Sequence, residues 1–279
     1  MRELKGRVAI ITGASRGIGV HVARALAGKG THLALAARNT TELEAVRAEL
    51  SALGVNVVAV PTDVCDPAAR QALFDATEAQ LGPPDILVNN AGMEAASAYE
   101  KLSHDEIQRF IDINLAAPMH LTRLVLPGML ERDRGHIVNI ASLAGLGPTA
   151  FGEPYGATKH GLVGFTKSLR ASSKVSGSNV SASAICPGYV RDVGMYQQMQ
   201  DDGAEAAGPL LGTSSPQAVA AAVLRAIHAD LPDVVVNPGL PRLMFALMLL
   251  FPRFGEWAAL RTGSFDVFKT AADARGRGR

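Results

Sequence analysis

Short apolar runs alternate with longer amphipathic stretches along most of this chain. The runs are rich in Val, Ile, Leu and Ala, which is typical of parallel strands buried on both faces. They predict strands at residues 8–11, 32–37, 55–60, 86–88, 136–140, 180–185 and 234–236. The stretches between them predict helices at residues 20–27, 41–53, 67–80, 103–132 and 155–173, and another that opens at 215–216. Strand alternating with helix predicts an α/β fold with a doubly wound parallel sheet, covered by helices on both faces.

Two helices carry specific boundary signals. Ser103 followed by Glu106 has the spacing of a capping box, and Ser215-Pro216 places an N-cap residue before a proline at the first helical position. Pro127 lies inside the helix predicted at 103–132 and predicts a kink or a break there.

The alternation runs without a polar linker from Val8 to about Val236, which favours one domain over residues 1–240. Residues 241–279 form a C-terminal extension, in which Leu243 to Phe251 is apolar all round. These nine residues are too few to cross a bilayer, which needs about twenty. Three interpretations stay open: a helix packed on the domain or a partner subunit, which we favour, a cover over an apolar substrate channel, or peripheral membrane contact.

Composition bears on the partners and the compartment expected for the protein. The 279 residues carry a net charge of +1, so no overall attraction to nucleic acid is expected. Cys65 and Cys186 lack metal-type spacing, and we expect buried free thiols and no metal site. Residues 1–5 lack the apolar core of a signal peptide, so we expect a cytoplasmic protein in a reducing compartment.

The segment from Thr12 to Gly19 joins the first predicted strand to the first helix. Its glycines, Gly13, Gly17 and Gly19, allow a tight turn and close approach of a pyrophosphate, and the helix N-terminus attracts the negative charge. An ordinary strand-to-helix turn is the alternative, but the flanking strand and helix favour a nucleotide site.

Tyr155 and Lys159 are four residues apart on a predicted helix and therefore share one face. An ammonium beside a phenol favours the phenolate and lowers its pKa from about 10 towards the working pH. Such a tyrosine can donate a proton to a carbonyl oxygen or accept one from an alcohol. The pair alone occurs by chance on many helices, so its meaning depends on the other motifs.

Those motifs follow a set order along the chain: Thr12 to Gly19, Asp63-Val64, Asn89 to Gly92, Asn114, Ser142, Tyr155 to Lys159, and Pro187-Gly188. In this order they resemble the classical short-chain dehydrogenase/reductase family, over roughly residues 5 to 240. The resemblance implies a Rossmann-like fold, a small carbonyl or alcohol substrate, and a homodimer or homotetramer that pairs the helices containing Asn114 and Tyr155.

The resemblance also assigns four catalytic residues. It implies that Tyr155 is the general acid in reduction and the base in oxidation, and that Lys159 holds the nicotinamide ribose and lowers the pKa of the tyrosine. Ser142 would hydrogen-bond the substrate oxygen. Asn114 would hold the water through which Lys159 exchanges protons with solvent. Asn89 is expected to steady the central sheet instead.

A larger set is expected to bind the cofactor: Gly13, Ser15, Arg16, Gly17, Ile18, Gly19, Arg38, Asp63, Val64, Asn90, Ala91, Gly92, Tyr155, Lys159, Pro187, Gly188 and Val190. Relatives that prefer NAD(H) usually carry an acidic residue at the end of the second strand, where this chain has Arg38. Arg38 and Arg16 can both reach a 2′-phosphate, although each alone could be a surface residue. We therefore expect NADP(H) rather than NAD(H).

Asp192 departs from the family pattern, because relatives commonly carry a Thr there. Its charge could favour the oxidised cofactor, or it could cap the next helix or pair with Arg191. Gly194 to Leu211 stands where relatives carry a mobile substrate lid. Further pocket candidates are Leu143, Phe151, Glu153 and Tyr189.

The leading functional prediction is NADP(H)-dependent hydride transfer between nicotinamide and an apolar ketone or secondary alcohol, with Tyr155 as general acid/base. One alternative is a 3-oxoacyl reductase of the fatty-acid or polyketide type. The other is a non-catalytic NADP-binding regulator, against which the intact Ser142, Tyr155 and Lys159 argue.

Overall fold

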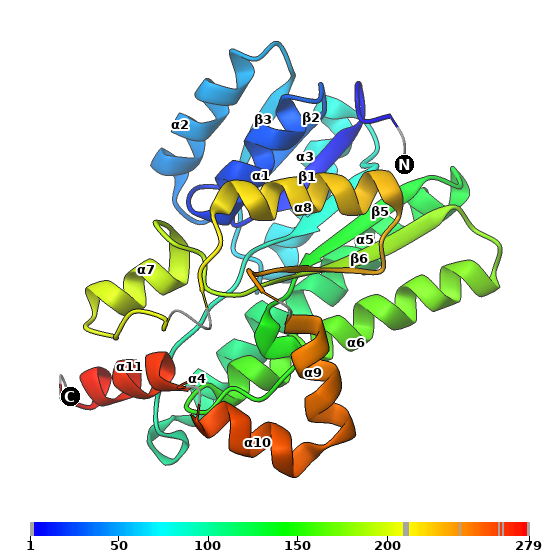
Figure 1. Ribbon diagram of the computed structural model, residues 1–279. Coiled ribbons are helices and arrows are strands. Elements are labelled where there is room, and N and C mark those ends of the chain that lie inside the picture. Colours follow the sequence, from blue (N-terminus) through cyan, green and yellow to red (C-terminus); the bar gives the residue numbers. More distant parts are fainter. Residues whose placement is uncertain (1–2, 209–211, 240, 262, 264, 278–279) are drawn as a thin grey trace.

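Every predicted apolar run forms a strand in the computed structural model, which describes residues 3–208, 212–239, 241–261, 263 and 265–277. The strands are β1 (Val8–Thr12), β2 (His32–Ala37), β3 (Val57–Pro61), β4 (Ile86–Asn89), β5 (Gly135–Ile140), β6 (Val180–Pro187) and β7 (Asp233–Val236). They form one parallel sheet in the order β3-β2-β1-β4-β5-β6-β7 (Figure 1). The winding direction reverses between β1 and β4, where Rossmann-like sheets bind their ligands.

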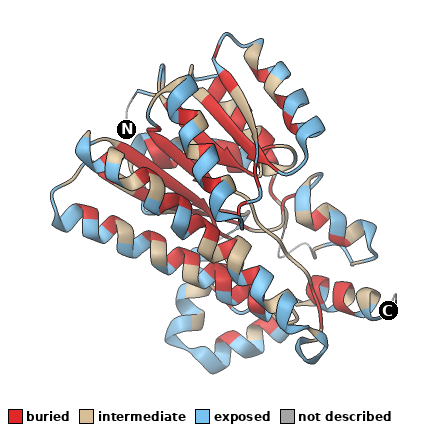
Figure 2. Cartoon of the chain, turned by 180° about the vertical axis from the view of Figure 1, so that it is seen from behind, coloured by how far each residue is buried: buried red, intermediate tan, exposed pale blue. Residues whose placement is uncertain are grey.

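Helices cover both faces of this sheet. One face carries α1 (Ile18–Ala27), α2 (Thr40–Ser51) and α8 (Pro216–Ala229), and the other carries α3 (Pro67–Leu81), α5 (Ala117–Glu131) and α6 (Glu153–Val175). Successive side chains of a strand point to opposite faces. In β1, Ala9 and Ile11 accordingly pack against the first group of helices and Ile10 against the second. Figure 2 shows the result: β1, β4 and β5 are buried throughout, the edge strands β3 and β7 only in part, and the helices mainly on the side that faces the sheet.

Side-chain caps set several helix starts, as the sequence predicted. Ser103 and Glu106 form the expected capping box before α4 (His104–Ile111): Ser103 Oγ accepts from the Glu106 amide at 3.2 Å, and Glu106 Oε2 accepts from the Ser103 amide at 2.9 Å. Ser215 caps α8 in the same way. Helix α6 begins two residues earlier than predicted, because Pro154 is accommodated in its first turn.

The helix predicted at 103–132 is interrupted, but not at Pro127. A π-helical turn at Asp112–Ala116 separates α4 from α5, and α5 continues through Pro127. The predicted break at the proline is therefore wrong. The irregularity lies where the buried Asn114 bonds to neighbouring segments, as is common for π-turns at functional sites.

The C-terminal extension forms three helices, α9 (Pro241–Leu250), α10 (Pro252–Arg261) and α11 (Asp266–Arg277). They lie beyond the carboxyl ends of the strands, with α11 beside α7 (Gly194–Asp201) and with α9 and α10 as a hairpin (Figure 1). Single 3₁₀ turns occur at Tyr99–Lys101 and Leu143–Gly145. Among the described helices, none is long and apolar enough to span a membrane.

The two cysteines differ in their surroundings. Cys186 is buried in β6, as expected, and burial raises the pKa of its thiol to about 12. Cys65 is exposed, so the expectation that both are buried is wrong for this residue. It lies in the loop between β3 and α3, a kind of connection that normally runs over the protein surface.

Candidate active site

A cavity of about 920 Å³ opens at the carboxyl edge of the sheet, and residues directly after all seven strands line it. Parallel strands end at one edge, so motifs far apart in sequence converge there. Of the predicted catalytic and cofactor-binding residues, all but Gly19 and Asn114 line this cavity. The predicted site is therefore one place in the molecule, although the roles of its residues stay predictions.

Gly19 lies behind the glycine-rich loop rather than in the cavity wall. A Cβ atom there would approach the Gly13 carbonyl oxygen to 2.2 Å and Asn90 Nδ2 to 2.7 Å, which no side chain tolerates. Gly13 and Gly17 adopt positive φ angles of 64° and 63°, which favour glycine. The three glycines thus serve backbone geometry, which brings the loop and the start of α1 to the cavity.

Asn90 clamps this loop to the segment that follows β4. Its Nδ2 donates to the carbonyl oxygens of Thr12 at 2.9 Å and Gly13 at 3.0 Å. In return, Thr12 Oγ1 accepts from the amides of Asn90 and Ala91, both at 3.0 Å. The Asn90 side chain therefore holds the loop in shape. Asn89 donates to Asn139 Oδ1 at 2.8 Å across β4 and β5, consistent with its expected role in the sheet.

The two arginines expected to bind phosphate lie at the α1–α2 end of the cavity. Arg16 and Arg38 are both exposed, and within the described part of the chain neither has a hydrogen-bond or ion-pair partner. Their guanidinium groups are therefore free to meet an anion. Glu42, in the first turn of α2, lines the same end and was missed by the sequence reasoning, because it lies outside every motif.

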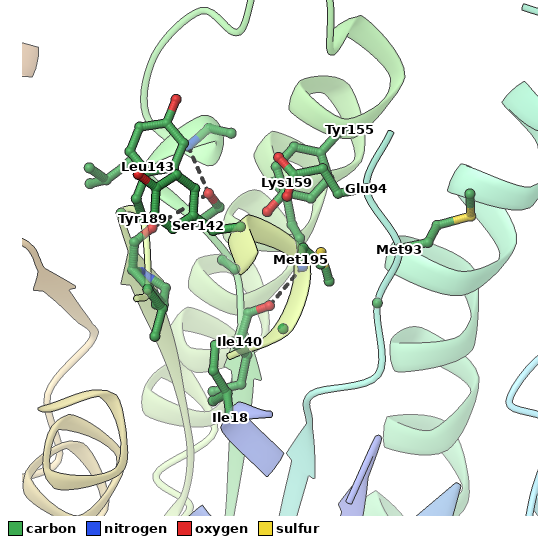
Figure 3. A pocket seen from close by; sticks show the side chains of 18 of the residues that line it. Ile18, Met93, Glu94, Ile140, Ser142, Leu143, Tyr155, Lys159, Tyr189 and Met195 are labelled. Carbon is green, nitrogen blue, oxygen red and sulfur yellow. Dashed lines mark hydrogen bonds between the residues drawn. The ribbon is translucent and has the colours of Figure 1, made fainter. Parts of the chain in front are cut away.

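Tyr155, Lys159 and Ser142 meet at the opposite end of the cavity (Figure 3). Lys159 Nζ lies 5.6 Å from the centre of the Tyr155 ring and donates to the Ile140 carbonyl oxygen at 2.9 Å. Ser142 Oγ accepts from the Ala144 amide at 3.1 Å. The segment after β5 and the first turns of α6 thus supply the three groups that acid–base chemistry on a carbonyl needs.

The expected lowering of the Tyr155 pKa is not found. Burial raises the pKa of the Tyr155 phenol, the nearby Glu94 carboxylate raises it further, and a hydrogen bond with Ser142 opposes both. Burial lowers the pKa of Lys159 to about 8, and Glu94 opposes that change. The sequence argument counted the charge of Lys159 but not the loss of water around both groups.

Asn114 does not line the cavity, and its expected role as the holder of a water molecule stays a prediction. Its Oδ1 accepts from the Met93 amide at 2.8 Å, and its Nδ2 donates to the Met93 carbonyl oxygen at 2.9 Å and to Thr158 Oγ1 at 3.3 Å. The side chain is fully buried and engaged. It ties the segment after β4 to α6 through Thr158, the residue next to Lys159.

Asp192 points away from the cavity. Its side chain is 77% exposed, lies 3.6 Å from Arg191 and does not line the cavity wall. The structure therefore supports the pairing with Arg191 and not a charge beside the nicotinamide. In the lid predicted at 194–211, Met195 and Tyr196 line the cavity, whereas Met199 is buried away from it. Residues 209–211 lie outside the described residues.

The rest of the cavity near Tyr155 is walled by apolar side chains. Leu143 and Tyr189 line it as expected, but Phe151 and Glu153 do not. Phe151 packs in an apolar cluster, and the Glu153 carboxylate accepts a hydrogen bond from the Phe151 backbone amide. The C-terminal extension contributes a wall that sequence reasoning left open: Met244, Phe245, Leu247, Met248, Phe254, Ala258, Ala259, Phe265 and Phe268. The inner face of the extension thus covers the cavity, and which partner its outer face meets stays a prediction.

Glu94 is the most important residue that the sequence reasoning missed. It follows β4 and lines the cavity beside Tyr155 and Lys159 (Figure 3). Burial raises the pKa of its carboxyl group to about 7, and Lys159 opposes this increase. Its place directly after Gly92-Met93 was the only available signal, and a single acidic residue there has no meaning without the fold.

The fold and this cavity together define a dinucleotide-dependent oxidoreductase. A family model described as short chain dehydrogenase matches residues 7–204, and the chain belongs to this family, as its motifs predicted. The prediction of an enzyme that acts on CH–OH groups is thereby confirmed at the level of the family.

Individual relatives agree with this assignment. The chain is 39% identical over 257 residues to "Ketoacyl reductase HetN" of a Nostoc species, covering 90% of this chain and 88% of that protein. A crystal structure of a variant actinorhodin polyketide ketoreductase with NADPH has a TM-score of 0.76 and 31% identity, and covers 86% of this chain and 99% of that one. A Burkholderia phymatum short-chain dehydrogenase/reductase crystallised with NAD has a TM-score of 0.79 and 29% identity. The match covers 90% of this chain and 96% of that one.

Proposed function

We propose that this protein is an NADP(H)-dependent oxidoreductase that transfers a hydride between nicotinamide and an apolar ketone or secondary alcohol, with Tyr155 as general acid/base. One observation carries the proposal: Tyr155, Lys159 and Ser142 share a single cavity with the glycine-rich loop. A dinucleotide held by that loop would have room in the same cavity to reach the acid–base group. A non-catalytic regulator has no need of this arrangement.

The residues present fit the cofactor, and each has a definable task. The loop with Gly13 and Gly17 suits the pyrophosphate, because it offers free amides and the positive end of the α1 dipole. The bound nicotinamide supplies or accepts the hydride. In reduction, Tyr155 donates its proton to the substrate oxygen, and Ser142 hydrogen-bonds the same oxygen. Lys159 holds the ribose and places a positive charge beside the phenol.

The preference for NADP(H) rests on Arg16 and Arg38. Both are exposed at the adenosine end, both are free of partners among the described residues, and no acidic side chain stands at the position of Arg38. Guanidinium groups pair well with phosphate. Similar structures were crystallised with NADPH and with NADP, and one with NAD. Comparing kcat/KM for NADPH and NADH tests this preference directly.

The apolar wall of the cavity supports an apolar substrate. Met195 of α7 and Phe245 of α9 line the cavity, and aromatic and methionine side chains bind apolar groups without demanding one shape. A 3-oxoacyl substrate is the second candidate, because relatives that cover most of the chain carry the name ketoacyl reductase. Both candidates undergo the same reaction and differ in what extends from the carbonyl.

A panel of carbonyl substrates, followed by NADPH oxidation, tests the proposal and separates these candidates. We expect turnover with apolar ketones such as aryl alkyl ketones and cyclic ketones. A strong preference for 3-oxoacyl thioesters would identify the second candidate. NADPH binding without turnover of any substrate would instead indicate a regulator and contradict the proposal.

We also propose a homodimer or homotetramer formed through α5 and α6. Ile111 at the end of α4, and Met119 and Leu130 on α5, are large apolar side chains exposed to 39%, 43% and 44%, respectively. Such a row suits burial against a second copy. Analytical ultracentrifugation of the wild type and Met119→Glu tests this, because a charge at the interface should shift the mass towards the monomer.

A further inference from the structure

Glu94 is a carboxylate inside an otherwise largely apolar part of the cavity. It is partly buried, and its side chain lies beside those of Tyr155 and Lys159 (Figure 3). Among the described residues it has no hydrogen-bond or ion-pair partner. Burial of an unpaired carboxylate is costly, so its presence beside the reacting groups calls for a function.

The groups that face Glu94 come from separate elements. Tyr155 and Lys159 extend from α6, and Tyr189 extends from the loop after β6. The negative charge of Glu94 raises the pKa of each of these three groups. Cys186 of β6 acts in turn on Tyr155 and Lys159, and Asp266 of α11 acts on Tyr189. Arg109 of α4 lines the same cavity.

Two of these groups have acidities suited to exchanging a proton. The pKa of Glu94 is raised to about 7 and that of Lys159 is lowered to about 8, in both cases chiefly by burial. Groups with similar pKa values near the working pH exchange a proton with little change in free energy. The two values belong to an interacting pair, so a titration reports the pair rather than either residue alone.

We propose that Glu94 is the proton-exchange residue of this site, which takes up the proton released through Tyr155 and Lys159 in alcohol oxidation and returns it in ketone reduction. This rests on the function proposed above. The place of Glu94 in the cavity wall beside Tyr155 and Lys159 supports it.

The proton count of the exchange is balanced. In oxidation the alcohol loses its hydride to the nicotinamide and its hydroxyl proton to the Tyr155 phenolate. Tyr155 passes one proton to Lys159 as the Lys159 ammonium passes another to the Glu94 carboxylate, so Lys159 keeps its positive charge. The described ion pairs include none between these last two residues, so a water molecule carries the proton between them. Glu94, being partly exposed, then releases it to solvent.

The sign of the pH dependence follows from the protonation state that each direction needs. Oxidation needs the carboxylate as acceptor, so kcat for oxidation should rise with pH through a step near 7. Reduction needs the carboxylic acid as donor, so kcat for reduction should fall through the same step.

The test compares pH profiles of kcat in both directions for the wild type, Glu94→Gln and Glu94→Asp. Gln keeps the shape but cannot accept a proton, so we expect the step to vanish and kcat for oxidation at pH 8 to fall about tenfold or more. Glu94→Asp should keep a step, and imidazole buffer should restore part of the lost rate in Glu94→Gln. Glu100→Gln, at an exposed position outside the cavity, is the matched control and should keep the wild-type profile.

Two outcomes would overturn the inference. One is a Glu94→Gln profile that keeps the step of the wild type. The other is a changed KM with an unchanged profile of kcat, which would make Glu94 a substrate-binding residue. Both require an active wild type, so they are distinct from a failure of the proposed function, in which the wild type itself shows no turnover.

Discussion

The two ends of the cavity are built in different ways. At the nucleotide end, the shape of the cavity depends mainly on the backbone. Glycines adopt positive φ angles, the Asn90 side chain donates to the carbonyl oxygens of Thr12 and Gly13, and the sheet brings the strand ends together. At the substrate end, apolar side chains from α7, α9, α10 and α11 form the wall. The first end allows few alternatives at each position, whereas the second tolerates many apolar residues of similar volume.

This difference teaches where specificity is encoded. A pyrophosphate and a ribose are the same in every member of a cofactor class, so one backbone geometry serves them. The substrate differs between enzymes, and a wall made by α7 and the C-terminal extension can change without disturbing the sheet. Substitutions at the two ends should therefore separate cofactor binding from substrate selection.

The largest effect is expected at Tyr155, where the two ends meet. Tyr155→Phe removes the proton donor and keeps the ring, which lies 6.4 Å from that of Phe268. Turnover should fall by about 10²–10⁴-fold, while NADPH affinity, measured by fluorescence titration, stays within a few fold of the wild type. Loss of NADPH binding in this variant would show that Tyr155 has a structural role instead.

At the nucleotide end, Gly19→Ala should damage the loop itself. The added methyl group would meet the Gly13 carbonyl oxygen at 2.2 Å, so we expect the free energy of unfolding to fall by about 1–3 kcal/mol and NADPH binding to weaken. Gly164→Ala in α6 is the control, because nothing lies within 4 Å of a Cβ there. It should leave binding intact and stabilise the helix slightly. Equal stability of the two variants in urea unfolding would contradict the steric argument.

Arg38→Ala should change which cofactor is preferred without changing the chemistry. Loss of a charge-assisted contact to the 2′-phosphate costs about 1.5–3 kcal/mol, so kcat/KM for NADPH should fall by roughly 10- to 150-fold while that for NADH hardly changes. Arg123→Ala, on the exposed face of α5, should alter neither value. A parallel decrease with both cofactors would place Arg38 away from the phosphate.

The smallest effect is expected at the substrate end. Phe245→Ala removes a cavity-lining ring whose edge packs closely against Gly147, so KM for apolar ketones should rise by about tenfold with little change in NADPH affinity. Phe251→Ala, 59% exposed at the end of α9, is the control and should leave KM unchanged. The same change of KM in both variants would mean that α9 acts only through its general stability.

The sequence predicted the sheet and the nucleotide end well, because both depend on local patterns. Apolar runs identified all seven strands, and residues that follow strands necessarily meet at one edge. The sequence failed where an outcome depends on packing. The break in the long helix was predicted at Pro127 but lies at the turn that contains Asn114. The pKa of Tyr155 was predicted from the charge of one neighbour, without the effect of its burial. Glu94 and Phe245 belong to no motif, because only the folded chain brings them to the cavity that Tyr155 lines.

The central claim is that this cavity transfers a hydride to a carbonyl carbon. Incubating the wild type with a turned-over ketone and NADPH deuterated at C4, once in each stereochemical form, tests it through the mass spectrum of the alcohol. We predict one deuterium at the carbinol carbon from one of the two forms, and none with Tyr155→Phe over the same time. Cofactor consumption with no deuterium in the alcohol from either form would contradict the account.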